Sequence, residues 1–368
     1  MTQSIRSHVR RLLPEPVRRH LRSVRERAAA QAARAFAVTS WTSSLYYLFD
    51  RSFRREHQAV LAAKWAYHRN LSARSGSSPM LRRNIHRIEK GLVSRPLRPV
   101  FAAGYIEETV RVFSSRVEAQ FGEIPATGEL RWAHDVLRHY FATVEERPAV
   151  ARARAAFEGV LADRTVATRP TAIAPYERDL AEPVPVGYDA FLALSVRRRS
   201  VRWFEQRPVP RDAIDRAILA AGYAPTACNR QPYRFLVYDE PELVSKVSTI
   251  PGGTRGFAHN FPVVVVLVGT LSAFFSERDR HLIYIDGSLA AMAFMYALET
   301  QGLSSCSINW PDLAGKERAL ARLIGLTPDE RVVMLMAVGH PDPNGLVPSS
   351  EKRVLDDVRY FNRVRADG

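Results

Sequence analysis

Residues 197–204 read RRRSVRWF and place four arginines around one serine, directly before two large aromatic residues. Arginine binds phosphate bidentately through its planar donors, so Arg198 and Arg202 beside Ser200 favour an anion site. The aromatic pair Trp203–Phe204 predicts the beginning of a hydrophobic core. On this segment alone, a solvated arginine cluster stays open as the alternative.

A second polar segment, APTACNRQPYRF, occupies residues 224–235. Pro225 ends a predicted helix, and Thr226 offers a hydroxyl group. The amides of Asn229 and Gln231 can each match a carbonyl and an N–H at the edge of a heterocycle. An ordinary polar loop between a helix and a strand is the alternative.

The pattern of elements after residue 188 predicts an α+β domain. Helices and strands mix there without a regular βαβ repeat, which argues against a doubly wound sheet. Helical periodicity covers residues 189–200, 211–225 and 286–303, with the last helix ending at Gly302, whereas strand patterns cover 233–238, 261–269 and 331–341.

The rest of the chain is predicted to be mainly helical. A length of 368 residues suits about two domains. We predict a basic arm at 1–36, a helical region at 37–168, a proline-rich linker at 169–187 and the α+β domain at 188–368.

The net charge of +15 belongs to the N-terminal quarter, because residues 1–100 hold 21 Lys and Arg against 5 Asp and Glu. An uncharged aromatic stretch at 37–49 follows the arginine-rich helix. Together they predict weak, salt-sensitive association with an anionic surface, first the inner leaflet of a bacterial membrane and second nucleic acid. Three alternatives stay open: a solvated arm, pairing with the acidic region at 107–146, and packing of 37–49 on the protein.

Cysteine usage and apolar runs predict a cytoplasmic protein, with the arm peripheral to the inner membrane. Cys228 and Cys306 cannot build a disulfide framework and are expected to be small buried residues. The apolar run at 261–268 is too short to cross a bilayer, and the N-terminus does not resemble a secretory signal.

The segment HRIEKGL sets His86 and Glu89 on one helical face. Such a pair could begin a metal site, but a matching second pair is not apparent. We therefore expect no metal and predict a salt-bridged helix end before Gly91.

The segments RRSVRWF and APTACNRQPY together resemble motifs of the nitroreductase family of flavin enzymes. Three further segments follow in that family's order: DGSLAAMAFMYALETQGLSSCSINW, MLMAVGHP and SSEKRVLDDVRYF. The resemblance covers about residues 190–365. It implies a three-layer fold in which helices flank a central mixed or antiparallel sheet.

The resemblance also implies FMN as cofactor and a homodimer as the active unit, because the second motif tends to reach the flavin across the dimer interface. The residues implied to bind FMN are Arg198, Arg199, Ser200, Arg202, Pro225, Thr226, Asn229, Gln231, Ile308, Asn309, Lys352 and Arg353. A loop containing Asn309 and Trp310 is implied to present a backbone N–H to flavin N5 and is the catalytic candidate. Whether Trp310 stacks on a ring or fills a gap stays open.

The predicted activity is transfer of hydride from NADH or NADPH to FMN and then to an unidentified small-molecule acceptor, by a ping-pong mechanism. Ala227 and Tyr233 depart from the family's usual hydroxyl and tryptophan, and Asn309 and Trp310 depart from its usual residues beside N5. Because the loop beside N5 shapes the pocket over the flavin, the substrate does not follow. One alternative is a tailoring oxidase or dehydrogenase in a biosynthetic pathway, for a surface polysaccharide or a natural product. Another is a non-catalytic flavin-fold binding module.

Overall fold

The structure, a computed structural model, describes residues 14–71, 76–120 and 123–362. It divides into two compact units, which meet in sequence between Gln58 and Ala59. The first unit contains α2 (Glu15–Phe36), α3 (Ser40–Phe49) and the beginning of α4 (Arg54–Asn70). The first part of the predicted arm, residues 1–13, lies outside the described residues.

Two prolines lie at the beginning of α2. Pro14 is the N-cap of α2 and Pro16 lies in its first turn, where a missing N–H costs no intrahelical hydrogen bond. In α3, Thr39 and Thr42 form a reciprocal capping box. Phe36 packs on Tyr46 with ring centroids 5.7 Å apart.

The second unit begins with a helical region that has its own hydrophobic core. Its elements are α5 (Pro79–Leu92), α6 (Ile106–Ala119), α7 (Glu129–Thr143), α8 (Pro148–Leu161) and a parallel pair of short strands, β1 (Glu123–Ile124) and β2 (Thr165–Val166). Phe113, Leu137 and Tyr140 are fully buried between these helices. The short strand pair was not expected from the sequence.

The HRIEKGL segment lies in α5 and packs this core. Glu89 accepts a 2.8 Å hydrogen bond from Trp132 Nε1, and its other oxygen lies 3.6 Å from His86 Nδ1. A Cβ at Gly91 would lie 2.2 Å from the Phe101 ring, so only glycine fits there. Across the ranges that the structure describes, no group of three or more His, Cys, Asp or Glu side chains is placed to hold a metal ion.

Residues 167–187, which include the predicted linker, form no helix or strand and are all described. The division of the chain into four regions stays a prediction. Beyond residue 187 the elements are α9 (Tyr188–Arg197), α10 (Arg211–Ala221), η1 (Ala227–Asn229), β3 (Tyr233–Tyr238), α11 (Pro241–Ser248), η2 (Ala258–Asn260), β4 (Val263–Thr270), η3 (Leu271–Ala273), η4 (Glu277–Asp279), α12 (Leu282–Glu299), β5 (Ser304–Asn309), α13 (Ala314–Ile324), β6 (Glu330–Gly339) and η5 (Leu355–Asp357).

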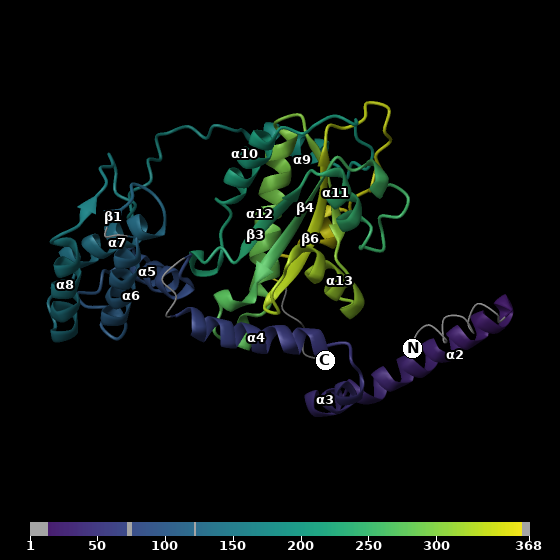
Figure 1. Cartoon of the computed structure of the whole chain (residues 1–368), viewed down its shortest axis with the longest axis horizontal. Coiled ribbons are helices and arrows are strands. Elements are labelled where there is room, and N and C mark those ends of the chain that lie inside the picture. The colour runs from purple at the N-terminus through teal and green to yellow at the C-terminus, as the bar shows by residue number, and fades with distance from the viewer. Residues whose placement is uncertain (1–13, 72–75, 121–122, 363–368) are drawn as a thin grey trace. The chain divides into compact units, whose positions relative to one another are not determined.

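The four longer strands form one antiparallel sheet in the order β3-β4-β6-β5. In β4, Val263, Val265 and Leu267 pack under α10 and α12, whereas the residues between them pack under α11 and α13. Figure 1 shows the two helical layers on opposite faces of the sheet. Alternate residues of a strand point to opposite faces of the sheet. The unbroken apolar run of β4 is therefore explained by burial of both faces of the sheet. The predicted α+β, three-layer fold is confirmed.

Several predicted boundaries differ from the observed ones. Helix α10 ends at Ala221, before Pro225, and α12 begins at Leu282 and ends at Glu299. The segment with Ile308 and Asn309, expected to be a loop, is the end of strand β5. Three serines give this segment a polar composition that does not predict a strand. Its antiparallel pairing with β6 stabilises the strand instead.

By length and hydropathy, one described stretch, Glu277–Glu299, reaches what a membrane span requires. It contains α12, whose residues Ile283, Ala290 and Phe294 are fully buried in the domain. Such burial is what a core helix of a three-layer fold requires.

Candidate functional site

The arginine segment lies along the outer edge of β5. Ser200 forms a parallel bridge with Ser305, and Val201 N donates a 3.0 Å hydrogen bond to the Ser305 carbonyl. Since β5 is an edge strand, its free backbone groups accept this extra pairing. Pairing of this kind fixes the backbone of residues 198–202 against the strand that ends at Asn309.

Close packing at the end of β6 holds the same segment. Phe204 is buried, and its ring approaches Gly339 so closely that a Cβ there would lie 2.8 Å from it. The prediction that Phe204 begins the core is confirmed. The same prediction for Trp203 is wrong, because that residue is 41% exposed and packs edge-on against His259 at the surface.

Two buried polar atoms have no hydrogen-bond partner where the arginine segment meets β5: Nε of Arg198 and Oγ of Ser305. Buried donors without a partner are rare and costly in proteins. Arg198 belongs to the segment that the sequence motif assigns to the phosphate of FMN, and Ser305 lies beside that segment, paired with Ser200. A phosphate oxygen is an acceptor for both groups, so the residues present fit FMN at this place.

A buried carboxylate lies behind the arginines. Glu299, at the end of α12, accepts a 2.9 Å hydrogen bond from Ser304 Oγ and lies 3.6 Å from Arg197 Nε. Burial raises the pKa of Glu299, although Ser304, Arg197 and Arg198 act in the opposite direction. Glu299 therefore pairs with Arg197 and lies within the electrostatic influence of Arg198.

Arg202 is held at both of its ends. Asn260 donates a 2.8 Å hydrogen bond to its carbonyl, and its guanidinium lies over the Phe257 ring, 5.6 Å from the centroid. Cys306 lies near it in β5, where burial raises the pKa of the thiol although the charge of Arg202 lowers it. Cys306 is a buried, free thiol as predicted, whereas Cys228 is only half-buried, which corrects the prediction for that residue.

The second motif lies at the opposite edge of the sheet, before β3. Cys228, Asn229 and Gln231 all have positive φ angles, 54°, 50° and 49°. Residues other than glycine adopt this region only where surrounding contacts enforce it. Gln231 donates through its backbone N–H to Thr226 Oγ1 at 3.1 Å and through its amide to Asn229 Oδ1 at 3.1 Å.

Two further elements hold this strained loop. From α12, the carboxylate of Asp286 accepts a 3.0 Å hydrogen bond from Ala227 N. Burial raises the pKa of Asp286, and the hydrogen bond from Ala227 and the charge of Arg230 only partly oppose this. From α5, Arg82 Nε donates a 2.5 Å hydrogen bond to the Asn229 carbonyl, and Arg82 also pairs with Glu129. The helical region thus braces a predicted cofactor loop.

The remaining predicted residues lie at the end of β5 and in the C-terminal tail. Asn309 is exposed and Ile308 is buried. Trp310 is buried in the core, and its Nε1 donates a hydrogen bond to Glu317, which favours the gap-filling alternative for its side chain. In the tail, Lys352 is exposed and Arg353 pairs with Asp357, four residues on.

Within one chain, the structure brings together Arg198, Arg199, Ser200, Arg202 and β5, but not the second motif. Asp286, which holds the second motif, and Glu299, beside the arginines, are thirteen residues apart on α12. At 1.5 Å per residue, that is about 20 Å along the helix. One chain therefore offers two separated half-sites.

Residues 196–251 and 243–340 match the family model described as Nitroreductase family. The C-terminal half of the chain carries a nitroreductase-family domain. Iodotyrosine deiodinase 1 of Rattus norvegicus is similar, with 24% identity over 196 residues, covering 46% of this chain and 68% of the relative. Iodotyrosine deiodinase of Hydra vulgaris has 24% identity over 198 residues, covering 46% and 71%.

The nitroreductase domain is also similar to solved structures. An FMN-dependent nitroreductase from Clostridium difficile R20291 is 20% identical, with a TM-score of 0.41, covering 47% of this chain and 99% of that one. A nitroreductase family protein from Streptococcus pneumoniae TIGR4 is 21% identical, with a TM-score of 0.40, covering 46% and 99%.

Sequence reasoning missed four residues around the two half-sites of the nitroreductase domain. Asp286 and Glu299 are isolated acids in an apolar helix, a pattern that could have indicated buried polar roles. Ser305 carried no signal apart from its neighbours. Arg82 carried none, because its partner lies 147 residues away in sequence.

Proposed function

We propose that this protein is an FMN-dependent oxidoreductase that takes electrons from NADH or NADPH. The observation that carries the proposal is the pair of buried, unpartnered donors, Arg198 Nε and Ser305 Oγ, inside the segment that matches the nitroreductase family. When bound, FMN supplies two-electron chemistry, accepting hydride from the nicotinamide and passing it to a second substrate in ping-pong order.

Different residues of the chain would bind different parts of the cofactor. Arg198, Arg199 and Ser200 would hold the phosphate, and Lys352 or Arg353 would approach it from the tail. Arg202 would supply positive charge near the flavin ring, where charge develops on reduction. The backbone at Asn309 and Trp310 would present an N–H to the reacting edge, and the buried Trp310 ring keeps that backbone in place.

The proposal includes a homodimer, because each chain offers two half-sites about 20 Å apart along α12. A second copy would bring its Pro225–Gln231 loop to the first copy's arginine segment. Support comes from exposed apolar side chains on neighbouring helices. They are Phe191, Leu192 and Val196 of α9, Leu219 of α10, and Ile285 and Leu289 of α12. Apolar patches of this kind mark interfaces between proteins.

The test begins with cofactor content. Purified protein should carry, or take up, one FMN per chain, and anaerobic mixing with NADH or NADPH should bleach the flavin absorbance. Protein that takes up no FMN would contradict the proposal. Rapid bleaching by either nicotinamide would also argue against a tailoring oxidase, and turnover with any acceptor would exclude a non-catalytic module.

The acceptor remains to be found, and the relatives suggest where to look first. A screen of the reduced enzyme should include nitroaromatic compounds and iodotyrosine, since iodotyrosine deiodinases are among the similar proteins. Reductive deiodination consumes two electrons and one proton per C–I bond, and it releases iodide and the ring with hydrogen in place of iodine. Flavin reoxidation without oxygen, together with released iodide, would identify that acceptor class.

A further inference from the structure

Helix α2 carries an apolar stripe that nothing covers in the described part of its unit. Val17, Leu21 and Val24 are 42%, 53% and 49% exposed. Their spacing of four and three residues, continued by Ala28, places them on one side of the helix. A helix of this kind is amphipathic with its apolar side turned outward.

The charges of α2 are distributed around this stripe in a definite way. Of the arginines in α2, Arg25 flanks the stripe on one side and Arg27 and Arg34 flank it on the other. Glu15 and Glu26, eleven residues apart, lie on the opposite side of the helix and pair with arginines there. The border of the stripe is therefore cationic, and the acidic groups point away from it.

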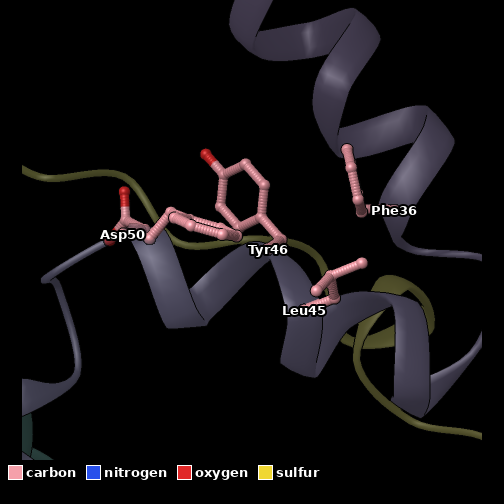
Figure 2. A pocket seen from close by; sticks show the side chains of 5 residues that line it. Phe36, Leu45, Tyr46 and Asp50 are labelled. Carbon is pink, nitrogen blue, oxygen red and sulfur yellow. The ribbon is translucent and has the colours of Figure 1, made fainter.

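Helix α3 carries exposed apolar side chains of its own and contains no charged residue. Trp41, Leu48 and Phe49 are 73%, 69% and 82% exposed. Trp41, Leu45 and Leu48 are spaced four and three residues apart, so they share one side of the helix. Figure 2 shows the pocket where Leu45 and Tyr46 of α3 lie near Phe36 at the end of α2.

We propose that α2 and α3 form an interfacial element that binds an anionic phospholipid surface. The stripe of α2 and the exposed side of α3 would enter the boundary between headgroups and acyl chains, and the flanking arginines would contact lipid phosphates. Tryptophan is enriched at this depth of a membrane. The inner leaflet of a bacterial membrane supplies such a surface. This proposal does not depend on the proposed flavin chemistry.

Charge complementarity distinguishes this partner from the others. A second copy of the chain would carry the same arginines, and like charges would face one another along the stripe. Nucleic acid would engage the arginines but would leave Val17, Leu21 and Val24 in water. An anionic lipid surface satisfies both the charge and the apolar side chains.

The test uses the full chain and lipid vesicles. Sedimentation is measured with phosphatidylcholine vesicles and with vesicles that contain about 30% phosphatidylglycerol, at about 50 and about 500 mM salt. We expect binding only to the anionic vesicles, and weaker binding at the higher salt. The stripe variant Leu21→Ser with Val24→Ser should bind at least about tenfold more weakly, because two buried apolar side chains are lost.

The matched control is Ala30→Ser with Ala33→Ser, which makes the same kind of change on the opposite side of α2 and should bind like the wild type. Replacing Arg25 and Arg27 by Gln should reduce the binding and flatten its salt dependence. Equal binding of the stripe variant and its control would overturn the proposal. So would equal binding to both vesicle types, a concentration-dependent dimer abolished by the stripe variant, or full displacement of lipid by duplex DNA.

Discussion

The two edges of the main sheet differ in what they offer a cofactor. At the β5 edge, the Arg198–Arg202 segment adds to the strand and leaves buried donors without partners. At the β3 edge, the Ala227–Asn229 turn has its backbone groups engaged and its residues in strained conformations. The Arg198–Arg202 segment on β5 is a charged cradle, and the Ala227–Asn229 turn at the opposite edge is a braced loop.

Under the proposed function, neither edge is a complete site. Both faces of the central strands are covered by helices, so a ligand cannot pass from one edge to the other across the sheet. The arrangement is explained if the braced loop of one chain meets the charged cradle of another. In the proposed dimer, the helical region would affect the flavin of the partner chain through the loop that it holds.

The largest effect is expected at the charged cradle. In the proposed complex, Arg198→Ala removes a charge-assisted hydrogen bond to the phosphate. The binding free energy of FMN should therefore weaken by about 2 kcal/mol, and its Kd should rise roughly thirtyfold. Arg207→Ala, which removes an exposed arginine paired with Glu205, should leave Kd unchanged. Fluorescence titration with FMN measures both. Equal Kd values for the two variants would contradict a role of the charged cradle in FMN binding.

A smaller effect is expected at the braced loop. Arg82→Ala leaves the Asn229 carbonyl without its donor, and the loop should lose about 1 kcal/mol of preference for its observed conformation. Kd for FMN should then rise roughly fivefold. Arg87→Ala on the same helix is the control, because the Arg87 guanidinium packs over the Tyr105 ring within the helical region. If R82A lowers the melting temperature but leaves Kd unchanged, the brace is only structural.

The smallest effect is expected from the charge of Asp286 behind the loop. Its pKa is raised in the folded state, mainly by burial, so the protonated carboxyl is favoured there. The contribution of Asp286 to the free energy of unfolding is fully present below the pKa that this residue has in the unfolded chain. The contribution is lost as the pH rises through the pKa that it has in the folded protein. Asp286→Asn keeps an acceptor for Ala227 and should not show this loss.

Urea denaturation from about pH 4 to pH 8 should therefore show that the free energy of unfolding of Asp286→Asn increases relative to that of the wild type as the pH rises. The gain should level off once Asp286 is ionised in the folded wild type. A wild type that gains on the variant over the same range would contradict the assigned direction of the shift.

Local sequence reasoning predicted most of the fold of the nitroreductase domain, and the reasons are visible in particular residues. The valine run of β4 and the apolar α12 carry strong periodic signals. Strand β5 was missed because Ser304, Ser305 and Ser307 are poor strand signals, and its pairing with β6 decides its structure.

The candidate site divides in the same way. The chemistry of the two motifs could be predicted from the sequence, because the hydrogen-bonding groups of arginine and amide side chains are known from the residue type. Their separation on opposite edges was not, because it depends on strand order. Arg82, the exposed Trp203 and the buried Trp310 are likewise set by tertiary packing, which local patterns do not encode.

The central claim is that one flavin site is built from two chains, and mixed dimers test it most directly. One chain carries Arg198→Ala with Ser200→Ala, the other carries Asn229→Ala with Gln231→Ala, and dimers with one chain of each are isolated through two affinity tags. If the half-sites come from different chains, each mixed dimer has one intact site and should bind roughly one FMN at a concentration where neither parent dimer binds. If each site lies within one chain, both sites of the mixed dimer are damaged, and FMN binding no better than that of the parents would contradict the account.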